Sequence, residues 1–388
     1  MIFVGADSDA QAAKLLEQTA TSGVYGAKLR PPANGRWRES QEGTFADYAT
    51  IRAGDSIFFF SRRKIYGIGK AVAVGEDCKY LSYPDASLPE TPEYEAIRPL
   101  MLRDEGPGSL AQRWLCLFEP APAIFTNGVD IDDVLSSDSR AFRALRAMQS
   151  VTFARMDESE TQALSDVILR ANENVIRHGT LDEASFKDES ATTHAEIAAK
   201  VSDQHRLSSA PILGACAEGE YLRHEMALEA GLVFQLATAE AATTDVFGEW
   251  DYVTHQVLAS PFKPLDWADR MDVFGYSYLP GYVPTISRFL VIEAKKDEAT
   301  TEVVDQVMKY VDWVKEEYAG DRYSAIRAFV VAYDFSEAVR NRAHEGGRRL
   351  QTVGRRPAVI EEWANLRLVR YRFDDSDETL KFTDVSPG

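Results

Sequence analysis

Two acidic residues and a lysine stand where they could act together. The apolar run Phe289 to Ile292 has the length and composition of a buried strand, and Glu293-Ala294-Lys295 follows at its end. Because side chains alternate along a strand, Glu293 and Lys295 share one face. A carboxylate and an ammonium at a buried strand end are costly unless the protein uses them.

A second acid lies upstream in another short apolar run, Met271 to Phe274, which contains Asp272. If this run pairs with the Phe289 strand as a hairpin, Asp272 and Glu293 converge on one hard cation. Two carboxylates with a backbone carbonyl and water suit Mg²⁺ or Mn²⁺ and leave positions for a phosphate oxygen and a hydrolytic water. Lys295 would orient or help to deprotonate that water and stabilise charge on the phosphate. The predicted chemistry is phosphodiester hydrolysis.

This arrangement resembles the PD-(D/E)XK nuclease superfamily, in particular its RecB-like and NucS-like branches. The resemblance is carried by Asp272, by Glu293-x-Lys295 after a hydrophobic strand, and by Gln306-x-x-x-Tyr310 on the next predicted helix. It implies an Mg²⁺-dependent endodeoxyribonuclease with Gln306 in the catalytic site and Tyr310 at the DNA. The connector between Asp272 and Glu293 is longer than usual, and Asp269 stands where the NucS-like pattern has glycine.

In this superfamily an acidic residue on the preceding helix completes the site. Glu220, Glu225 and Glu229 all compete for that role, and Glu220 is favoured because Glu220-x-Leu222-Arg223 most resembles the start of that helix.

The elements around these residues alternate between helix and strand from residue 211 to residue 388, which predicts a mixed central sheet flanked by helices, the restriction-endonuclease-like form of an α/β (α+β) fold. The expected helices are Gly219 to Ala230, Val303 to Tyr318 and Ala338 to Leu350, and the expected strands include Ala328 to Tyr333 and Leu366 to Phe373.

Residues 1–130 predict a small β-rich module. The strand Ser56 to Phe60 begins after a Gly-Asp turn, and the next strand, Gly67 to Val74, opens with closely spaced glycines. This pattern resembles PUA-like domains of the EVE type and implies a small barrel that binds RNA or a flipped, modified DNA base. The candidate walls of such a pocket are Tyr25, Trp37 and Phe59. Core packing is the alternative for each aromatic except Trp37, which stands between two arginines.

Basic residues form islands in a chain whose formal net charge is −18, a balance that argues against a broad phosphate-binding surface. Local patches decide where a polyanion sits, although solvated loops remain the alternative for each island. The candidate DNA contacts in these islands are Arg36, Arg38, Arg62, Arg63, Arg348 and Arg349.

Residues 131–210 predict a helical connector followed by a polar linker. Helical spacing extends over Asp132 to Arg177, and Asp157-x-x-Glu160 resembles a capping box at a helix start. The stretch Gly179 to Ala210 is rich in Ser, Thr, Asp and Glu, which favours a linker.

Composition excludes several other classes of protein. The three cysteines, at 78, 116 and 216, lie far apart, so neither a disulfide framework nor a cysteine zinc site is predicted. No signal-like start and no run of ~18 apolar residues occurs, which favours the cytoplasm and no membrane. No Walker loop, dinucleotide glycine pattern, His-Glu-x-x-His or Gly-x-Ser-x-Gly is present.

Together these features predict a modular Mg²⁺-dependent DNA endonuclease, acting as a homodimer in restriction or genome defence, with modified DNA as its target. A DNA-repair nuclease for mismatched, branched or single-stranded DNA is the nearest alternative. A non-catalytic nucleic-acid binding protein and an RNA-directed nuclease remain the others.

Overall fold

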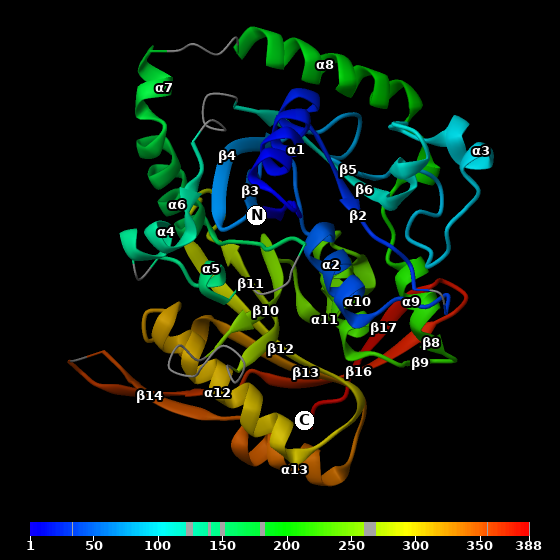
Figure 1. Cartoon of the computed structure of the whole chain (residues 1–388). Helices are drawn as coiled ribbons and strands as arrows, with labels where there is room; N and C mark the ends of the chain where they lie inside the picture. The colour runs from blue at the N-terminus through cyan, green and yellow to red at the C-terminus, as the bar shows by residue number, and fades with distance from the viewer. Residues whose placement is uncertain are drawn as a thin grey trace. The chain divides into compact units, whose positions relative to one another are not determined.

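The computed structural model describes residues 1–387 except for 33, 122–126, 139–140, 148–151, 179–182, 260–268 and 355. The chain divides into two compact units, one made of Met1–Trp37 and Ile51–Pro211, the other of Arg38–Thr50 and Ile212–Gly388. Helix α2 (Glu39–Ala49) therefore belongs to the second unit, although the chain on both sides of it belongs to the first (Figure 1). The sequence had placed this segment in the module of residues 1–130.

The second unit is built on a six-stranded sheet with the order β10-β11-β12-β13-β16-β17. The central strand β13 pairs in parallel with β12 and with β16. The β10-β11, β11-β12 and β16-β17 pairs are antiparallel. The sheet is thus mixed, and the predicted mixed α/β class is confirmed. Its strands are β10 (Tyr252–Leu258), β11 (Arg270–Tyr278), β12 (Ile286–Ala299), β13 (Ile326–Phe335), β16 (Leu366–Asp374) and β17 (Thr379–Asp384).

Helices cover both faces of this sheet, and strand β12 is therefore buried on both faces from Phe289 to Ala294. Helices α12 (Thr301–Glu317) and α13 (Glu337–Gly346) pack against β12, β13 and β16, while α10 (Glu225–Ala237) and α11 (Ala241–Phe247) pack against β10, β12 and β17. The valines of α12 recur at helical spacing and enter the core around Val291 and Val330.

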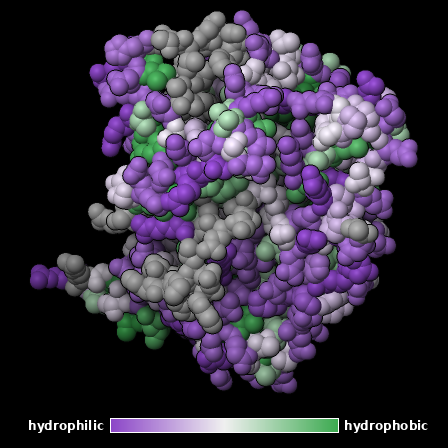
Figure 2. All heavy atoms as spheres, in the orientation of Figure 1, coloured by the Kyte–Doolittle hydropathy of each residue, from purple (hydrophilic) through white to green (hydrophobic). Residues whose placement is uncertain are grey.

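The end of predicted helix Ala338 to Leu350 is instead a strand. Helix α13 ends at Gly346, and β14 (Arg349–Val353) pairs with β15 (Val359–Trp363) as a separate antiparallel ribbon. Gly347 explains the stop, because a Cβ there would lie 2.4 Å from the Ala343 carbonyl oxygen. Figure 2 shows apolar surface at the place where this ribbon lies in Figure 1, and the ribbon exposes the side chains of Leu350, Val359 and Ile360.

The first unit contains a seven-stranded sheet whose main path is β1-β3-β4-β6-β2. In the described residues the pairings leave this path open, and no closed barrel of the PUA type is seen. The two end strands of this path nevertheless come close to each other, since the Tyr25 hydroxyl on β2 donates to the Phe3 carbonyl oxygen on β1 over 3.2 Å. The strands are β1 (Ile2–Phe3), β2 (Val24–Lys28), β3 (Ser56–Ser61), β4 (Lys64–Ala71), β5 (Lys79–Leu81), β6 (Gln112–Pro120) and β7 (Val129–Asp130).

The stretch expected to connect the two domains packs onto this sheet. Leu164 and Ile168 of α6 enter a core with Phe58 of β3, and Ile197 of α8 enters another with Leu115 of β6. The expected cap of α6 is confirmed, since the Asp157 side chain accepts from Glu160 N over 2.9 Å. The stretch expected as a polar linker is helical from Glu183 to Lys200, and Ile197 and Val201 at its end pack against the first unit's sheet. The helices are α1 (Asp9–Ser22), α3 (Tyr94–Ile97), α4 (Ile131–Ser137), α5 (Ala144–Ala147), α6 (Glu158–Ala171), α7 (Glu173–His178) and α8 (Glu183–Lys200), with short 3-10 turns at Arg98–Leu100, Pro107–Ala111 and Asp203–His205.

Helix α9 (Ala210–Cys216), which belongs to the second unit from Ile212 onward, leads into a small hairpin of β8 (Ala217–Glu218) and β9 (Tyr221–Leu222). No helix in the described part of the chain is long and apolar enough to cross a membrane.

Candidate functional site

Asp272 and Glu293 meet on neighbouring strands, as the sequence pattern suggested. Strands β11 and β12 pair with Val273 opposite Ile292, so extending this antiparallel register by one residue places Asp272 opposite Glu293. Lys295 Nζ lies 2.8 Å from Glu293 Oε1 and 3.8 Å from Asp272 Oδ2. The long connector between the two strands does not prevent the hairpin, because it is accommodated at residues 279–285, beyond the strand ends.

Two hydrogen bonds fix the orientation of the Asp272 carboxylate. The Ala294 amide donates to Oδ2 over 2.8 Å, and Gln256 Nε2 donates to Oδ1 over 3.2 Å. Gln256 also donates to Glu229 Oε2 over 2.9 Å, so one amide ties two acids together. It does so from a left-handed backbone conformation, φ 54°, which is uncommon for a residue other than glycine. No sequence motif pointed to Gln256.

The helix that brings further acids begins later than predicted. The expected helix from Gly219 to Ala230 is wrong in its first turn, because Gly219 (φ 67°) closes the β8-β9 hairpin and α10 starts only at Glu225. Glu220 consequently lies in the hairpin turn, where it is exposed and pairs with Arg372 at 3.3 Å. The structure does not bring Glu220 to Asp272.

The two competing acids reach the site instead. Glu225 and Glu229 are four residues apart on α10 and so project from one side of the helix. One carboxylate oxygen each from Glu225, Glu229 and Asp272 all lie within 4.8 Å of one another. Glu225 Oε1 accepts from Lys295 Nζ over 3.0 Å, and Glu229 is buried.

The buried acids hold negative charge at a cost. Burial, followed by the charges of Glu229 and Glu293, raises the pKa of Asp272 well above its ordinary value. Burial raises the pKa of Glu293 to about 7, against the attraction of Lys295. Among the described residues neither oxygen of Glu293 has a hydrogen-bond partner, and the nearby charge is the Lys295 ammonium, 2.8 Å from Oε1 as an ion pair.

These oxygens fit a hard divalent cation. A fully buried carboxylate without hydrogen bonds is destabilising in a protein interior, and a cation bound by several carboxylates removes that cost. Glu225, Glu229 and Asp272 each bring one oxygen within 4.8 Å of the others, and Glu293 lies across the strand pair from Asp272. The residues present therefore match the Mg²⁺ or Mn²⁺ expected from the sequence.

Lys295 is held as a cation. Burial by itself would lower the pKa of Lys295, but Glu293, Asp272 and Glu225 outweigh this and raise it above the ordinary value. Its Nζ also donates to the Ala294 carbonyl oxygen over 2.9 Å. This arrangement favours a charged hydrogen-bond donor and disfavours the base that the sequence interpretation allowed.

A buried histidine stands behind Glu229. His255 of β10 lies 3.6 Å from Glu229 Oε2 through Nδ1 and 3.2 Å from Asp47 Oδ1 through Nε2. Burial lowers the pKa of His255, but Asp47 and Glu229 reverse this and raise it to about 10. Asp47 comes from α2, so a residue of the amino-terminal part of the sequence pairs with the histidine that faces Glu229. No motif in the sequence indicated either residue.

Gln306 and Tyr310 lie one turn apart on α12. Gln306 Nε2 donates to the Tyr310 hydroxyl over 2.8 Å. Tyr310 is buried, and burial followed by the charge of Glu293 raises its pKa. The pair therefore backs the carboxylate site from α12, and Tyr310 is not an exposed surface on which DNA could lie.

Of the three aromatic residues expected to line a base pocket, Trp37 and Phe59 are core residues and Tyr25 is half-buried. Trp37 is 3% exposed and its Nε1 donates to the Ser87 carbonyl oxygen over 2.7 Å, with the Arg113 guanidinium above its ring. Phe59 is fully buried and stacks near Tyr25, whose ring also contacts Phe153. The expectation for Trp37 failed because arginines on either side do not expose a tryptophan whose indole fits the core.

The expected DNA-contacting arginines fall into two groups. Arg36 and Arg38 are exposed. The remaining arginines are exposed in part and pair with acids: Arg62 with Asp9, Arg63 with Asp130 and Asp132, Arg348 with Glu362, and Arg349 with Asp312.

Comparison with known proteins gives one likeness. No protein-family model and no curated protein matches the chain. Among solved structures the chain is similar to a repair endonuclease from Pyrococcus abyssi, with 23% sequence identity and a TM-score of 0.21. The matched part covers 34% of this chain and 47% of that one, so less than half of the similar protein is represented.

Proposed function

We propose that this protein is a metal-dependent nuclease that hydrolyses phosphodiester bonds in DNA, with its active site on β11, β12 and α10. The single observation behind this proposal is the meeting of Asp272, Glu293 and Lys295 around a buried carboxylate that lacks hydrogen bonds. The resemblance of the same residues to the PD-(D/E)XK pattern supports it.

Each side chain would have a separate part in hydrolysis. Asp272, Glu293 and Glu229 would hold Mg²⁺ or Mn²⁺, which when bound polarises a phosphate and lowers the pKa of a bound water. Lys295, held as a cation, would donate a hydrogen bond to the phosphate as its negative charge grows. Glu225 accepts a hydrogen bond from Lys295 and is more exposed than the other acids, so it is the carboxylate we assign to accept the proton of the attacking water. Gln256 and His255 would position Asp272 and Glu229.

The substrate and the setting are the finer part of the proposal. We place the enzyme in genome defence or DNA repair. We propose modified DNA as its target, and a homodimer as the form that cuts both strands. Because Trp37 and Phe59 are buried, a modified base would have to be recognised elsewhere in the chain.

The test is a cleavage assay on plasmid, cytosine-modified plasmid, single-stranded DNA and RNA, with Mg²⁺ or with EDTA. We expect Mg²⁺-dependent cleavage of at least one DNA and its loss in Lys295→Ala. Lys296→Ala is the matched control, because that neighbouring ammonium points to Tyr221 and Asp297 and should leave cleavage intact. Undiminished cleavage by Lys295→Ala would refute the assigned site, and cleavage of RNA alone would replace DNA as the substrate.

A further inference from the structure

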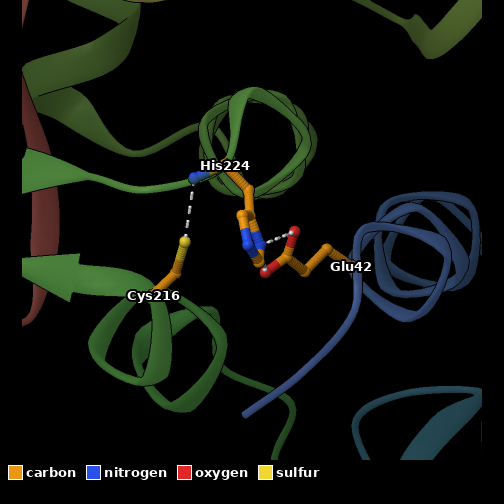
Figure 3. Close-up of side chains that lie close together, drawn as sticks. All are labelled: Glu42, Cys216 and His224. Carbon is orange, nitrogen blue, oxygen red and sulfur yellow. Dashed lines mark hydrogen bonds and ion pairs between the residues drawn. The ribbon is translucent and has the colours of Figure 1, made fainter.

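A second group of metal-binding side chains lies in the same unit, apart from the carboxylate site. Glu42, Cys216 and His224 each offer one ligand atom, and the three atoms all lie within 4.8 Å of one another. Figure 3 shows the imidazole of His224 between the carboxylate of Glu42 on one side and the Cys216 sulfur on the other, with the sulfur joined to the His224 amide.

Three separate segments supply these side chains. Glu42 lies on α2, Cys216 is the last residue of α9, and His224 directly precedes α10 with an extended backbone. His224 Nδ1 lies 2.8 Å from Glu42 Oε1, and the Cys216 sulfur accepts from the His224 amide over 3.3 Å. These contacts hold all three ligands close together before any ion binds.

Burial makes this group unusual for a simple ion pair. The Glu42 side chain is 1% exposed, and Cys216 is 1% exposed as a residue, whereas the His224 side chain is 27% exposed. A carboxylate buried this deeply is costly unless its charge is well compensated, and a single partly exposed histidine is a weak partner. The exposed edge of His224 gives an ion a route to the two buried ligands.

We propose that Glu42, Cys216 and His224 form a binding site for Zn²⁺ or a similar borderline-soft divalent cation. Thiolate, imidazole and carboxylate are the three protein ligands that Zn²⁺ takes, and Mg²⁺ does not favour sulfur or nitrogen. Three protein ligands leave a fourth tetrahedral position for water. The carboxylate site, which offers only oxygen, suits the opposite class of ion.

A bound ion would brace the start of α10 against α2 and α9. Glu225 follows His224 directly, and Glu229 lies one turn further along the same helix. The ion would therefore act as a structural support for the helix that carries two acids of the proposed nuclease site, while its binding does not depend on that site being catalytic.

The experiment uses the full chain, stripped with EDTA and titrated with Co²⁺ as a spectroscopic probe and then with Zn²⁺. A tetrahedral Co²⁺ bound by a thiolate gives visible bands and a sulfur-to-metal charge-transfer band, which carboxylates do not give. We expect one equivalent of Co²⁺ with this signature, displaced by Zn²⁺ and retained in millimolar Mg²⁺. Cys216→Ser should abolish the charge-transfer band, and His224→Asn should weaken Zn²⁺ binding about tenfold or more.

Two controls separate this site from its surroundings. Cys78→Ser, which alters another buried thiol, and Glu293→Gln, which alters the carboxylate site, should both keep the thiolate band. Protection of Cys216 from alkylation by Zn²⁺ in the unmodified protein gives a reading that does not depend on any variant folding. Absence of the thiolate band in the unmodified protein, or an undiminished band in Cys216→Ser, would overturn the proposal.

Discussion

Replacement of Glu293 by glutamine should stabilise the metal-free protein and at the same time remove its response to Mg²⁺. The wild-type carboxylate is fully buried, and a pKa raised from its ordinary value of 4.5 to about 7 corresponds to about 3 kcal/mol of destabilisation once the group is ionised. Glutamine has nearly the same shape and no charge. Because Glu293 and Asp272 interact closely, the shift belongs in part to the pair, and about 3 kcal/mol is the ceiling of the effect for Glu293 alone.

The pH dependence gives the sign of the effect. A carboxyl whose pKa is raised on folding contributes least to stability above the folded pKa, so the wild type loses stability as the pH rises from about 4.5 to about 7. Glu293→Gln does not lose this contribution, and its advantage should therefore be small at pH 5 and full at pH 8. In EDTA at pH 8 we expect its melting temperature to exceed that of wild type by several degrees, on the order of 2–4 °C per kcal/mol.

The assay is thermal unfolding followed by fluorescence, in EDTA and in a Mg²⁺ titration. Wild type should be stabilised by Mg²⁺ through mass action, whereas Glu293→Gln should not respond. Glu220→Gln is the control, because that exposed carboxylate pairs with Arg372 in the β8-β9 turn and should match wild type throughout. The reasoning fails if Glu293→Gln melts no higher than wild type in EDTA at pH 8, or if Mg²⁺ raises both melting temperatures equally.

Three further predictions concern other parts of the molecule. Burial raises the pKa of Glu160 to about 7, so the wild type loses stability as the pH rises from about 4.5 to about 7. Glu160→Gln should therefore gain stability relative to wild type over this range, by at most about 3 kcal/mol. Urea unfolding measures the difference, and a difference that stays constant across the range would contradict the prediction. Gly275→Ala should lower the free energy of unfolding by about 1–3 kcal/mol, because its Cβ would lie 2.6 Å from the Tyr252 carbonyl oxygen. Gly214→Ala is the control: in a helix, with nothing within 4 Å of the added Cβ, it should leave the stability unchanged or raise it. His255→Asn should weaken Mg²⁺ binding by about 10–100-fold in calorimetry, and unchanged affinity would remove the positioning role given to the histidine.

The opposite effects expected on stability and on metal binding follow from the same charges. Five acids face Lys295 and His255 in a largely buried region, and burial raises the carboxyl pKa values of two of them, Asp272 and Glu293. We therefore expect the folded protein to be less stable without the cation than with it.

Local sequence determined the elements with the strongest patterns. The apolar run before Glu293 had to become a buried strand, and the period of two placed Glu293 and Lys295 together. The valines of α12 fixed its helical face, and with it the neighbours Gln306 and Tyr310. In the same way the mixed sheet of the second unit followed from the alternation of strands and helices.

Tertiary structure decided which residues complete the site and which leave it. A single glycine conformation at Gly219 moved the helix start and exchanged Glu220 for Glu225 and Glu229, a choice that helical periodicity cannot make. Asp47 joined His255 only because α2 packs with the second unit, across a sequence separation that leaves no local signal. Trp37 entered the core because burial of a large apolar ring outweighs the polarity of its neighbours in sequence. Local pattern thus sets the type of an element and the face of a residue, while the partner of a side chain depends on contacts that only the folded chain makes.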